Sequence, residues 1–136
     1  VGSEMCIRDR ININEVCDVN PFGVEALIAA YSPEGNNWLT DLREYIHDNY
    51  IYTRDLITSR LHCPVTRLEA TYLPWVDISS LGIPADALEE KLLKDAGVWV
   101  NSGVMYGADG YIRLNIACPR STLEEALNLI IDSLSR

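Results

Sequence analysis

The stretch YIRLNIACPR, residues 111–120, decides the fold of this chain. It is a run of β-forming residues with one cation, Arg113, inside it. Because side chains alternate between the two faces of a strand, we expect one apolar face and one polar face here. The apolar face holds Ile112, Leu114 and Ile116, and the polar face holds Tyr111, Arg113 and Asn115. A guanidinium on a rigid strand is a two-pronged receptor for a carboxylate, and a solvated arginine is the alternative interpretation.

The chain before residue 64 is predicted to be helical. Asn20-Pro21 begins a short helix with one apolar face. Residues 32–37, SPEGNN, form a loop by composition. A long helix follows from about Trp38 to Leu61, with a polar patch at Asp48-Asn49.

Residues after 64 are predicted to alternate between strands and helices. Strands at 65–69 and 72–78 form a pair, and Pro74 either places the second strand at a sheet edge or breaks it. A helix over about 84–96 ends at Gly97, and short strands follow at 97–100 and 111–118. This order predicts an α/β fold of the two-layer α+β kind, a small sheet with helices packed on one side.

The last helix shows a start signal and a core face. Ser121 and Glu124 have the spacing of a capping box. The apolar stripe of this helix consists of Leu123, Leu127, Ile130 and Leu134. We interpret this stripe as a core face rather than as a partner site.

Composition limits the classes of function. The chain of 136 residues has the length of one domain, and its net charge of −9 argues against binding to nucleic acid or anionic membranes. No apolar run approaches the ~20 residues of a membrane helix. Cys17, Cys63 and Cys118 lack metal-ligand spacing, and His47 and His62 are isolated, so we expect no metal site. Residues 1–10, VGSEMCIRDR, resemble a translated sequencing adapter, and we expect the chain to be a truncated reading frame.

Four segments together resemble fold-type I pyridoxal-phosphate enzymes, the class I/II aminotransferase superfamily. They are VNPFGVEAL at 19–27, EATYLPWVD at 69–77, GVWVNSG at 97–103 and RLNIACPR at 113–120. The last segment is similar to the cystathionine β-lyase (MalY/PatB) branch, whereas Pro74 and the loop at 102–107 depart from it. The resemblance runs from about Ile11 to Arg136 and covers about the last third of a family member.

This resemblance implies a domain organisation. Residues 11–35 would be the end of a large pyridoxal-phosphate-binding domain, residues 36–62 a long interdomain helix, and residues 63–136 the C-terminal small domain. It also implies the cofactor pyridoxal 5'-phosphate, an amino-acid substrate, and a cytoplasmic homodimer with active sites at the subunit interface.

The resemblance also assigns substrate-binding residues. Arg113 would bind the α-carboxylate of the substrate, and Tyr72 and Asn101 would approach the substrate. Asn115 would either orient Arg113 or make a plain hydrogen bond at the sheet edge. Tyr72 has an alternative interpretation as a half-buried strand aromatic.

Four further residues have competing interpretations. Asn20 and Phe22 match a turn near the dimer interface and the active-site edge in the family, and a helix start with a buried aromatic is the alternative. Arg120 is the rival of Arg113, but its place before a helix favours a structural role. Asp77 has no partner carboxylate, and we interpret it as a strand-end residue.

Catalysis is not expected of this chain alone. A pyridoxal-phosphate enzyme needs a Schiff-base lysine, and the two lysines, Lys91 and Lys94, lie on the polar face of a short helix. No catalytic residue is therefore assigned here, and the cofactor-binding residues are unknown. The leading hypothesis is the C-terminal part of a C–S β-lyase or a related aminotransferase. A free-standing α+β module that binds an amino acid or a protein partner is the alternative.

Overall fold

The computed structural model describes residues 20–135. The predictions for the adapter-like residues 1–10, for Cys17 and for the rest of segment 11–19 lie outside the described residues. The chain divides into two compact units, residues 1–41 and residues 42–136.

In the first unit, helix α2 (Pro21–Ala30) begins as the sequence predicts. The Asn20 side chain accepts a hydrogen bond from the Phe22 backbone N–H at 2.9 Å, and Pro21 takes the first helical position. No residue of α2 is buried, and the Phe22 side chain is 84% exposed. The interpretation of Phe22 as a buried aromatic does not hold in this chain.

The loop predicted for residues 32–37 is wrong after its first residue. Helix α3 spans Pro33–Leu61 and starts about five residues earlier than expected. The Ser32 hydroxyl accepts the Gly35 N–H at 3.1 Å, so Ser32 caps the helix and Pro33 opens it. A Cβ on Gly35 would stand 2.5 Å from two backbone carbonyl oxygens at the end of α2, so glycine is required for this tight turn.

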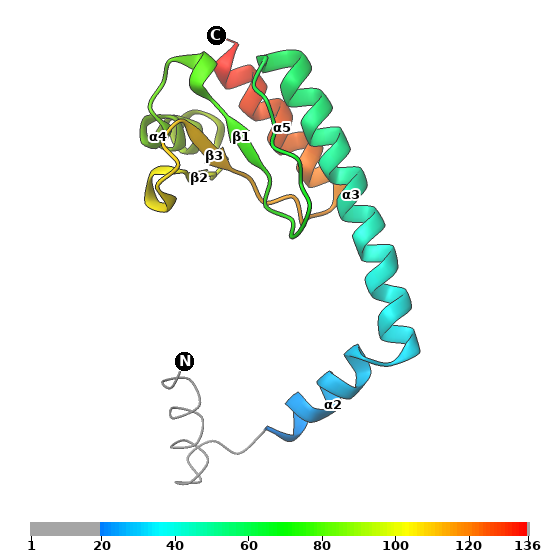
Figure 1. Ribbon diagram of the computed structural model, residues 1–136. Coiled ribbons are helices and arrows are strands. Elements are labelled where there is room, and N and C mark those ends of the chain that lie inside the picture. Colours follow the sequence, from blue (N-terminus) through cyan, green and yellow to red (C-terminus); the bar gives the residue numbers. More distant parts are fainter. Residues whose placement is uncertain (1–19, 136) are drawn as a thin grey trace, which may run out of the picture. The chain divides into compact units, whose positions relative to one another are not determined.

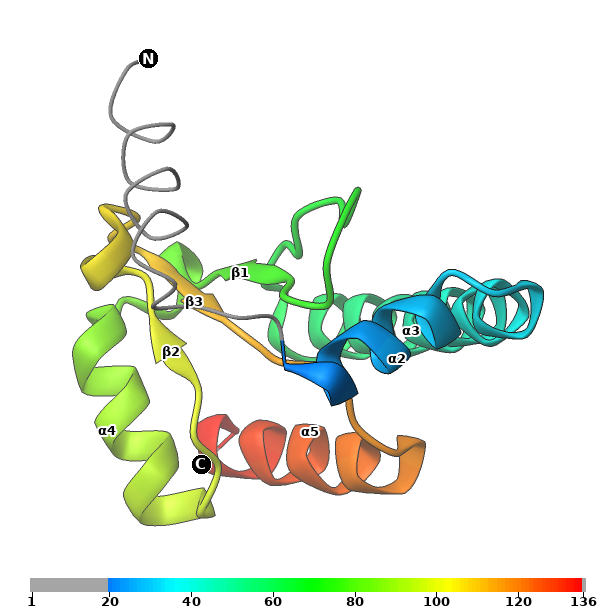
Figure 2. The ribbon, with the colours of Figure 1, turned by 90° about the horizontal axis from the view of Figure 1, so that it is seen from below.

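The second unit contains a three-stranded antiparallel sheet with the order β1-β3-β2. The strands are β1 (Trp75–Asp77), β2 (Asn101–Ser102) and β3 (Tyr111–Arg113). Figure 2 shows β3 between β1 and β2. The pairing places Arg113 opposite Trp75 on one side and opposite Asn101 on the other. Two short 3-10 helices, η1 (Ser79–Leu81) and η2 (Val104–Tyr106), lie in the connections.

Helices cover one face of this sheet, as the sequence predicts. Figures 1 and 2 show α4 (Ala85–Ala96) and α5 (Arg120–Leu134) packed side by side against it. The core between helices and sheet includes Ile57, Val76, Ile78, Leu88, Leu92, Ile112, Ile116, Leu123, Leu127 and Ile130. Burial of this apolar surface is the main driving force for the fold.

The strands are shorter than the sequence predicts. Val65 forms only an isolated bridge to Val76, β2 starts at Asn101 instead of Gly97, and β3 ends at Arg113. Pro74 explains the late start of β1, because it has no N–H to continue the ladder. As predicted, β1 is an edge strand.

The alternation of faces nevertheless continues beyond the end of β3. Ile112, Leu114 and Ile116 are buried, whereas Arg113 is half-buried and Asn115 is exposed. The Leu114 and Ile116 N–H groups still donate to the carbonyls of residues 74 and 72, at 3.0 and 3.1 Å. The two predicted faces of the segment are confirmed.

The capping box predicted for the last helix is wrong. Helix α5 begins at Arg120, and Ser121 lies inside its first turn. The Arg120 backbone N–H donates to the Tyr45 hydroxyl at 2.7 Å, so a side chain of α3 supplies the cap. The predicted core face is confirmed, because Leu123, Leu127 and Ile130 are buried and Leu134 is half-buried.

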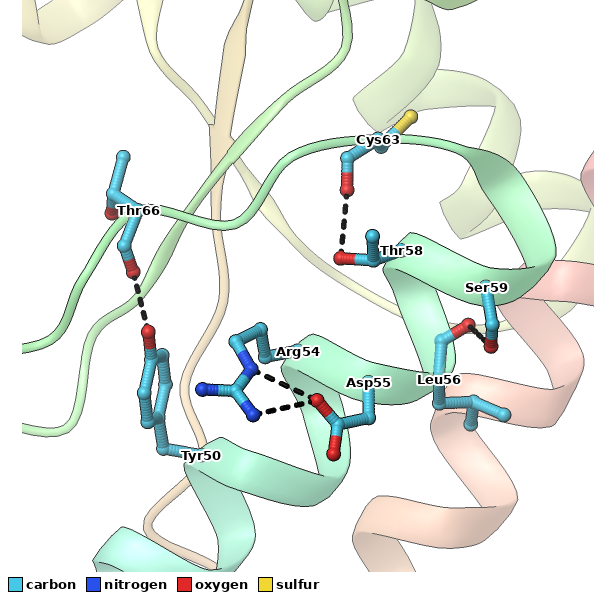
Figure 3. A network of polar contacts seen from close by, with 8 residues as sticks. All are labelled: Tyr50, Arg54, Asp55, Leu56, Thr58, Ser59, Cys63 and Thr66. Atoms are coloured by element: carbon cyan, nitrogen blue, oxygen red, sulfur yellow. Dashed lines mark hydrogen bonds and ion pairs between the residues drawn. The ribbon is translucent and has the colours of Figure 1, made fainter.

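The second half of α3 is tied to the chain around it by polar contacts. Asn49 is fully buried rather than part of a surface patch, and its Nδ2 donates to the carbonyls of Ile116 and Cys118 at 2.9 and 3.1 Å. Figure 3 shows the Tyr50 hydroxyl donating to the Thr66 carbonyl at 3.1 Å. These contacts tie two segments to α3, the one after β3 and the one before β1.

Candidate functional site

The face of the sheet opposite the helices carries the candidate site. Strand pairing places Trp75, Arg113 and Asn101 side by side on this face. All three are half-buried, whereas the neighbouring Ile112 is buried against the helices. The site is therefore built on strand backbone, which is more rigid than a loop.

The Arg113 guanidinium is held from two directions. Its Nη2 donates to the Asn101 Oδ1 at 3.2 Å, and its Cζ lies 4.6 Å from the centroid of the Tyr106 ring. The Trp75 ring meets Tyr106 edge-on, with centroids 5.4 Å apart and planes at 90°. The Arg113 Nε is buried without a hydrogen-bond partner. The guanidinium is thus oriented by neutral groups, and its hydrogen-bonding capacity is not used up within the described residues.

No acidic side chain of residues 20–135 neutralises Arg113. The ion pairs among these residues join Arg54 to Asp55, Arg67 to Glu69, Lys91 to Asp95 and Lys94 to Glu90. A half-buried cation without a counter-charge carries a desolvation penalty that an incoming anion offsets. A planar carboxylate fits this receptor, because the guanidinium can donate two parallel hydrogen bonds to it.

Arg120 lies in a different environment. Its Cζ stands 4.7 Å from the centroid of the Tyr52 ring, and its Nη1 is buried without a partner. However, Asp48 and Asp55 also line the open groove beside it. Like charges repel a carboxylate ligand there. The electrostatic surroundings therefore favour Arg113 over Arg120 as the carboxylate receptor.

Of the other predicted site residues, one contacts Arg113 in the structure and the rest lie in other local surroundings. Asn101 contacts Arg113 directly. The exposed Asn115 side chain accepts the Ala117 N–H at 3.0 Å within its own turn. The Tyr72 side chain is 43% exposed. Asn20 and Phe22 belong to the first unit.

Three residues of the site had not been singled out from the sequence. The Tyr106 ring contacts the Arg113 guanidinium, and Trp75 packs against Tyr106. Glu89 of α4 accepts the Ser102 N–H at 2.7 Å and the Trp99 indole N–H at 3.0 Å, which fixes the outer edge of β2. Trp75 could have been found by aligning the strands, but the contact of Tyr106 depends on a loop conformation that no periodicity encodes.

Neither lysine fits a Schiff-base role. The Lys91 Nζ is 2.7 Å from an Asp95 carboxylate oxygen, and the Lys94 Nζ is 2.6 Å from the Glu90 Oε1. The hydrogen bond and charge of Glu90 raise the pKa of Lys94. A nucleophilic lysine needs the opposite shift. The described residues therefore do not fit attachment of pyridoxal phosphate.

Two further features of the described residues bear on the class of site. Between residues 20 and 135 there is no group of three His, Cys, Asp or Glu side chains that could hold a metal ion. No helix in that range is long and apolar enough to cross a membrane.

The fold and the strand-borne arginine together define an α/β domain of the pyridoxal-phosphate-dependent transferase fold. A putative aminotransferase from Clostridium difficile 630, solved with bound pyridoxal phosphate, is similar over 93% of this chain and 33% of its own, with a TM-score of 0.85 and 35% identity. A pyridoxal-phosphate-bound C–S lyase from Staphylococcus hominis is similar over 94% of this chain and 35% of its own, with a TM-score of 0.81 and 31% identity.

The chain belongs to the family of class I and II aminotransferases, which residues 14–130 match. It is 34% identical over 125 residues to cystathionine β-lyase PatB of Bacillus subtilis, an alignment that covers 90% of this chain and 32% of PatB. The chain thus spans about a third of the length of the proteins it matches. The resemblance derived from the four sequence segments is confirmed at the level of family and fold.

Proposed function

We propose that this chain is the substrate-carboxylate-binding part of a pyridoxal-phosphate-dependent C–S β-lyase that acts on amino acids. The observation that carries the proposal is the state of Arg113. It is half-buried, has no acidic partner within residues 20–135, and keeps a buried Nε donor without a partner. An amino-acid carboxylate supplies the missing counter-charge and can accept hydrogen bonds from the guanidinium.

Each site residue has a role in this proposal. Arg113 binds the α-carboxylate through two parallel hydrogen bonds, and Asn101 fixes the direction of its guanidinium. Holding the carboxylate fixes the orientation of the substrate Cα–H bond for cleavage. Tyr72 lies on the exposed side of the chain and contributes a wall of the substrate site, and Asn115 shapes the turn after β3.

The cofactor belongs to the complete protein in this proposal. Pyridoxal phosphate supplies an electron sink for carbanion chemistry when bound. The residues of this chain contribute substrate binding, and the Schiff-base lysine and the phosphate ligands are expected outside the described residues. We propose a cytoplasmic homodimer whose subunits each contain an 11–35 large-domain end, a 36–62 interdomain helix and a 63–136 small domain. Asn20 and Phe22 would then lie at the edge of the dimer interface and active site.

A transaminase is the second candidate, because it requires the same carboxylate receptor. The names of PatB and of the Staphylococcus hominis enzyme favour a lyase, whereas the Clostridium difficile protein is named as an aminotransferase. Membership of the family weighs against the free-standing binding module. Product analysis decides between the two enzymes. A lyase releases thiol, ammonia and a 2-oxo acid, whereas a transaminase releases no thiol and passes the amino group to an acceptor 2-oxo acid.

The central experiment replaces Arg113 by Lys in the complete gene product. We expect kcat/KM for an amino-acid substrate to fall about ten- to hundredfold, because a point charge cannot reproduce two charge-assisted hydrogen bonds. Arg120→Lys is the matched control and should leave kcat/KM within about twofold of the wild type. An unchanged kcat/KM in Arg113→Lys, or a larger loss in Arg120→Lys, contradicts the proposal.

A second experiment tests the 136-residue chain directly. The chain is incubated with pyridoxal phosphate and reduced with borohydride, and labelled lysines are located by mass spectrometry. We expect no stoichiometric labelling of Lys91 or Lys94, since both are held in ion pairs. Stoichiometric labelling of one lysine together with turnover would place catalysis within this chain.

A further inference from the structure

We propose that Tyr106 is a positioning residue, which holds the plane of the Arg113 guanidinium for the substrate carboxylate. The inference rests on the proposed role of Arg113 and deepens it. Tyr106 does not need to touch the substrate in this role. It acts by presenting a ring face to the guanidinium 4.6 Å away.

Among the described residues, the Arg113 guanidinium has two restraints of different kinds, a hydrogen bond to Asn101 and the ring face of Tyr106. The hydrogen bond from Nη2 to Asn101 fixes one end of the guanidinium at 3.2 Å. A single hydrogen bond leaves the plane of the group free to rotate about that contact. The Tyr106 ring lies beneath the Arg113 Cζ at 4.6 Å and restrains this rotation in the proposal, because guanidinium groups favour contact with aromatic faces. Orientation of the plane decides whether two donors meet a carboxylate together.

The Tyr106 ring is itself held in place. The Trp75 ring packs against it edge-on at 90°, and Trp75 is the cross-strand neighbour of Arg113. The same strand pair therefore carries both the arginine and the residue that fixes its aromatic support. An arginine, a tyrosine and a tryptophan form one connected cluster on the face of the sheet away from the helices.

The loop between β2 and β3 brings Tyr106 to this cluster. The Gly103 N–H donates to the Tyr111 carbonyl at 2.8 Å, and the Gly103 carbonyl accepts N–H groups from Tyr106 and Ala108 at 2.9 and 3.0 Å. A Cβ at Gly103 would collide with the Ala108 carbonyl oxygen and stand 2.6 Å from that of Tyr111. The loop therefore packs tightly against the Gly103 backbone, where no side chain fits, and it turns η2 back toward Arg113.

Simple packing makes a different prediction from positioning. If Tyr106 only filled space beside Trp75, any apolar side chain of similar size would serve. If it orients Arg113, an aromatic ring is required and the hydroxyl is not. Tyr106→Phe keeps the ring face, and Tyr106→Leu removes it. The comparison of these two variants separates the two roles.

The test is a double-mutant cycle between positions 106 and 113 in the complete gene product, with the side-chain resonances of the 136-residue chain as a second readout. We expect Tyr106→Leu to lower kcat/KM about two- to fivefold, mainly through KM, and Tyr106→Phe to restore it. In the Arg113→Lys background, Tyr106→Leu should have no further effect. In the 136-residue chain, the Arg113 side-chain protons should be shifted upfield by the ring in wild type and Tyr106→Phe, and not in Tyr106→Leu.

A matched control is available because Arg120 also faces a tyrosine. Tyr52 lies 4.7 Å from the Arg120 Cζ, and Tyr52→Leu should leave kcat/KM unchanged. Suppose that Arg113→Lys lowers kcat/KM. The positioning role is then overturned, and the proposed function stands, if Tyr106→Leu leaves kcat/KM unchanged, if Tyr106→Leu and Tyr106→Phe have the same kcat/KM, or if the loss from Tyr106→Leu adds fully to that from Arg113→Lys. If Arg113→Lys is itself neutral, the proposed function fails and the positioning role fails with it.

Discussion

Replacing Asn49 by Ala should destabilise the second unit by about 2–3 kcal/mol. Asn49 is fully buried, and its two Nδ2 hydrogen bonds reach the segment that follows Arg113. Removing one partner of a buried hydrogen bond costs about 1–3 kcal/mol, because the other partner is left unsatisfied. Two carbonyls, those of Ile116 and Cys118, lose their donor. The better helix propensity of alanine and the loss of the Asn49 Oδ1, which is buried without a partner, offset part of this cost.

The assay is urea unfolding of the 136-residue chain, followed by far-ultraviolet circular dichroism. Asn37→Ala is the matched control, because Asn37 is exposed on the same helix. It should be neutral or stabilising by a few tenths of a kcal/mol. Asn49→Asp should be worse than Asn49→Ala, since a carboxylate would face two carbonyl oxygens in a buried place. If Asn49→Ala unfolds within about 0.5 kcal/mol of Asn37→Ala, the two bonds do not anchor the segment and the reasoning is refuted.

Three further perturbations test other contacts. Gly103→Ala should destabilise the chain by about 1–3 kcal/mol in the same unfolding assay. Gly23→Ala is its control and should be neutral or stabilising, because an added Cβ there would stand 3.9 Å from the Asn20 Cβ, and equal stabilities would contradict the close packing at Gly103. Tyr45→Phe removes the acceptor for the first N–H of α5 and should cost about 0.5–1 kcal/mol, while an unchanged midpoint would mean that water replaces the cap. A side-chain hydrogen bond and a backbone hydrogen bond from Ser79 lower the pKa of Asp77 below 3.8. The ionised carboxylate therefore contributes stability above the unfolded-state pKa. This stability is lost as pH falls through the lowered folded-state pKa. In an NMR titration, Ser79→Ala should move the Asp77 midpoint upward, and an unmoved midpoint would remove the side-chain contribution.

The sequence predicted the faces of the elements better than their ends. Alternation along residues 111–116 and the stripe of α5 depend on burial, and burial is what the apolar pattern encodes. Helix and strand ends depend on single contacts between distant residues. Ser121 has good capping chemistry, but the N-cap is Pro119, two residues earlier, and the Tyr45 hydroxyl, 75 residues away in the chain, accepts the Arg120 N–H. Composition likewise indicated a loop at 32–37, where the Ser32 cap and Gly35 turn start a helix.

The same distinction applies to the site. Arg113 could be predicted because a cation within an apolar strand is a local feature of the sequence. The local sequence could not show which residues contact Arg113. Asn115 lies two residues away on the same face but bonds to its own turn, whereas Tyr106 reaches Arg113 from a loop. Spacing along one strand identifies residues that share a face. Only the closed loop and the strand register identify residues that share a contact.

The contacts of Arg113 also explain how a cation is tolerated in this sheet without an acidic partner. An ion pair within the chain would neutralise Arg113 permanently, and a substrate carboxylate would then have to displace it. A neutral amide and an aromatic face stabilise the guanidinium more weakly and leave its charge available. If the proposed function holds, the guanidinium is ordered before a substrate carboxylate arrives, and its ion pair is left for that carboxylate to form, which favours tight and oriented binding. On this argument, placing an acid next to Arg113 would stabilise the chain and weaken substrate binding together.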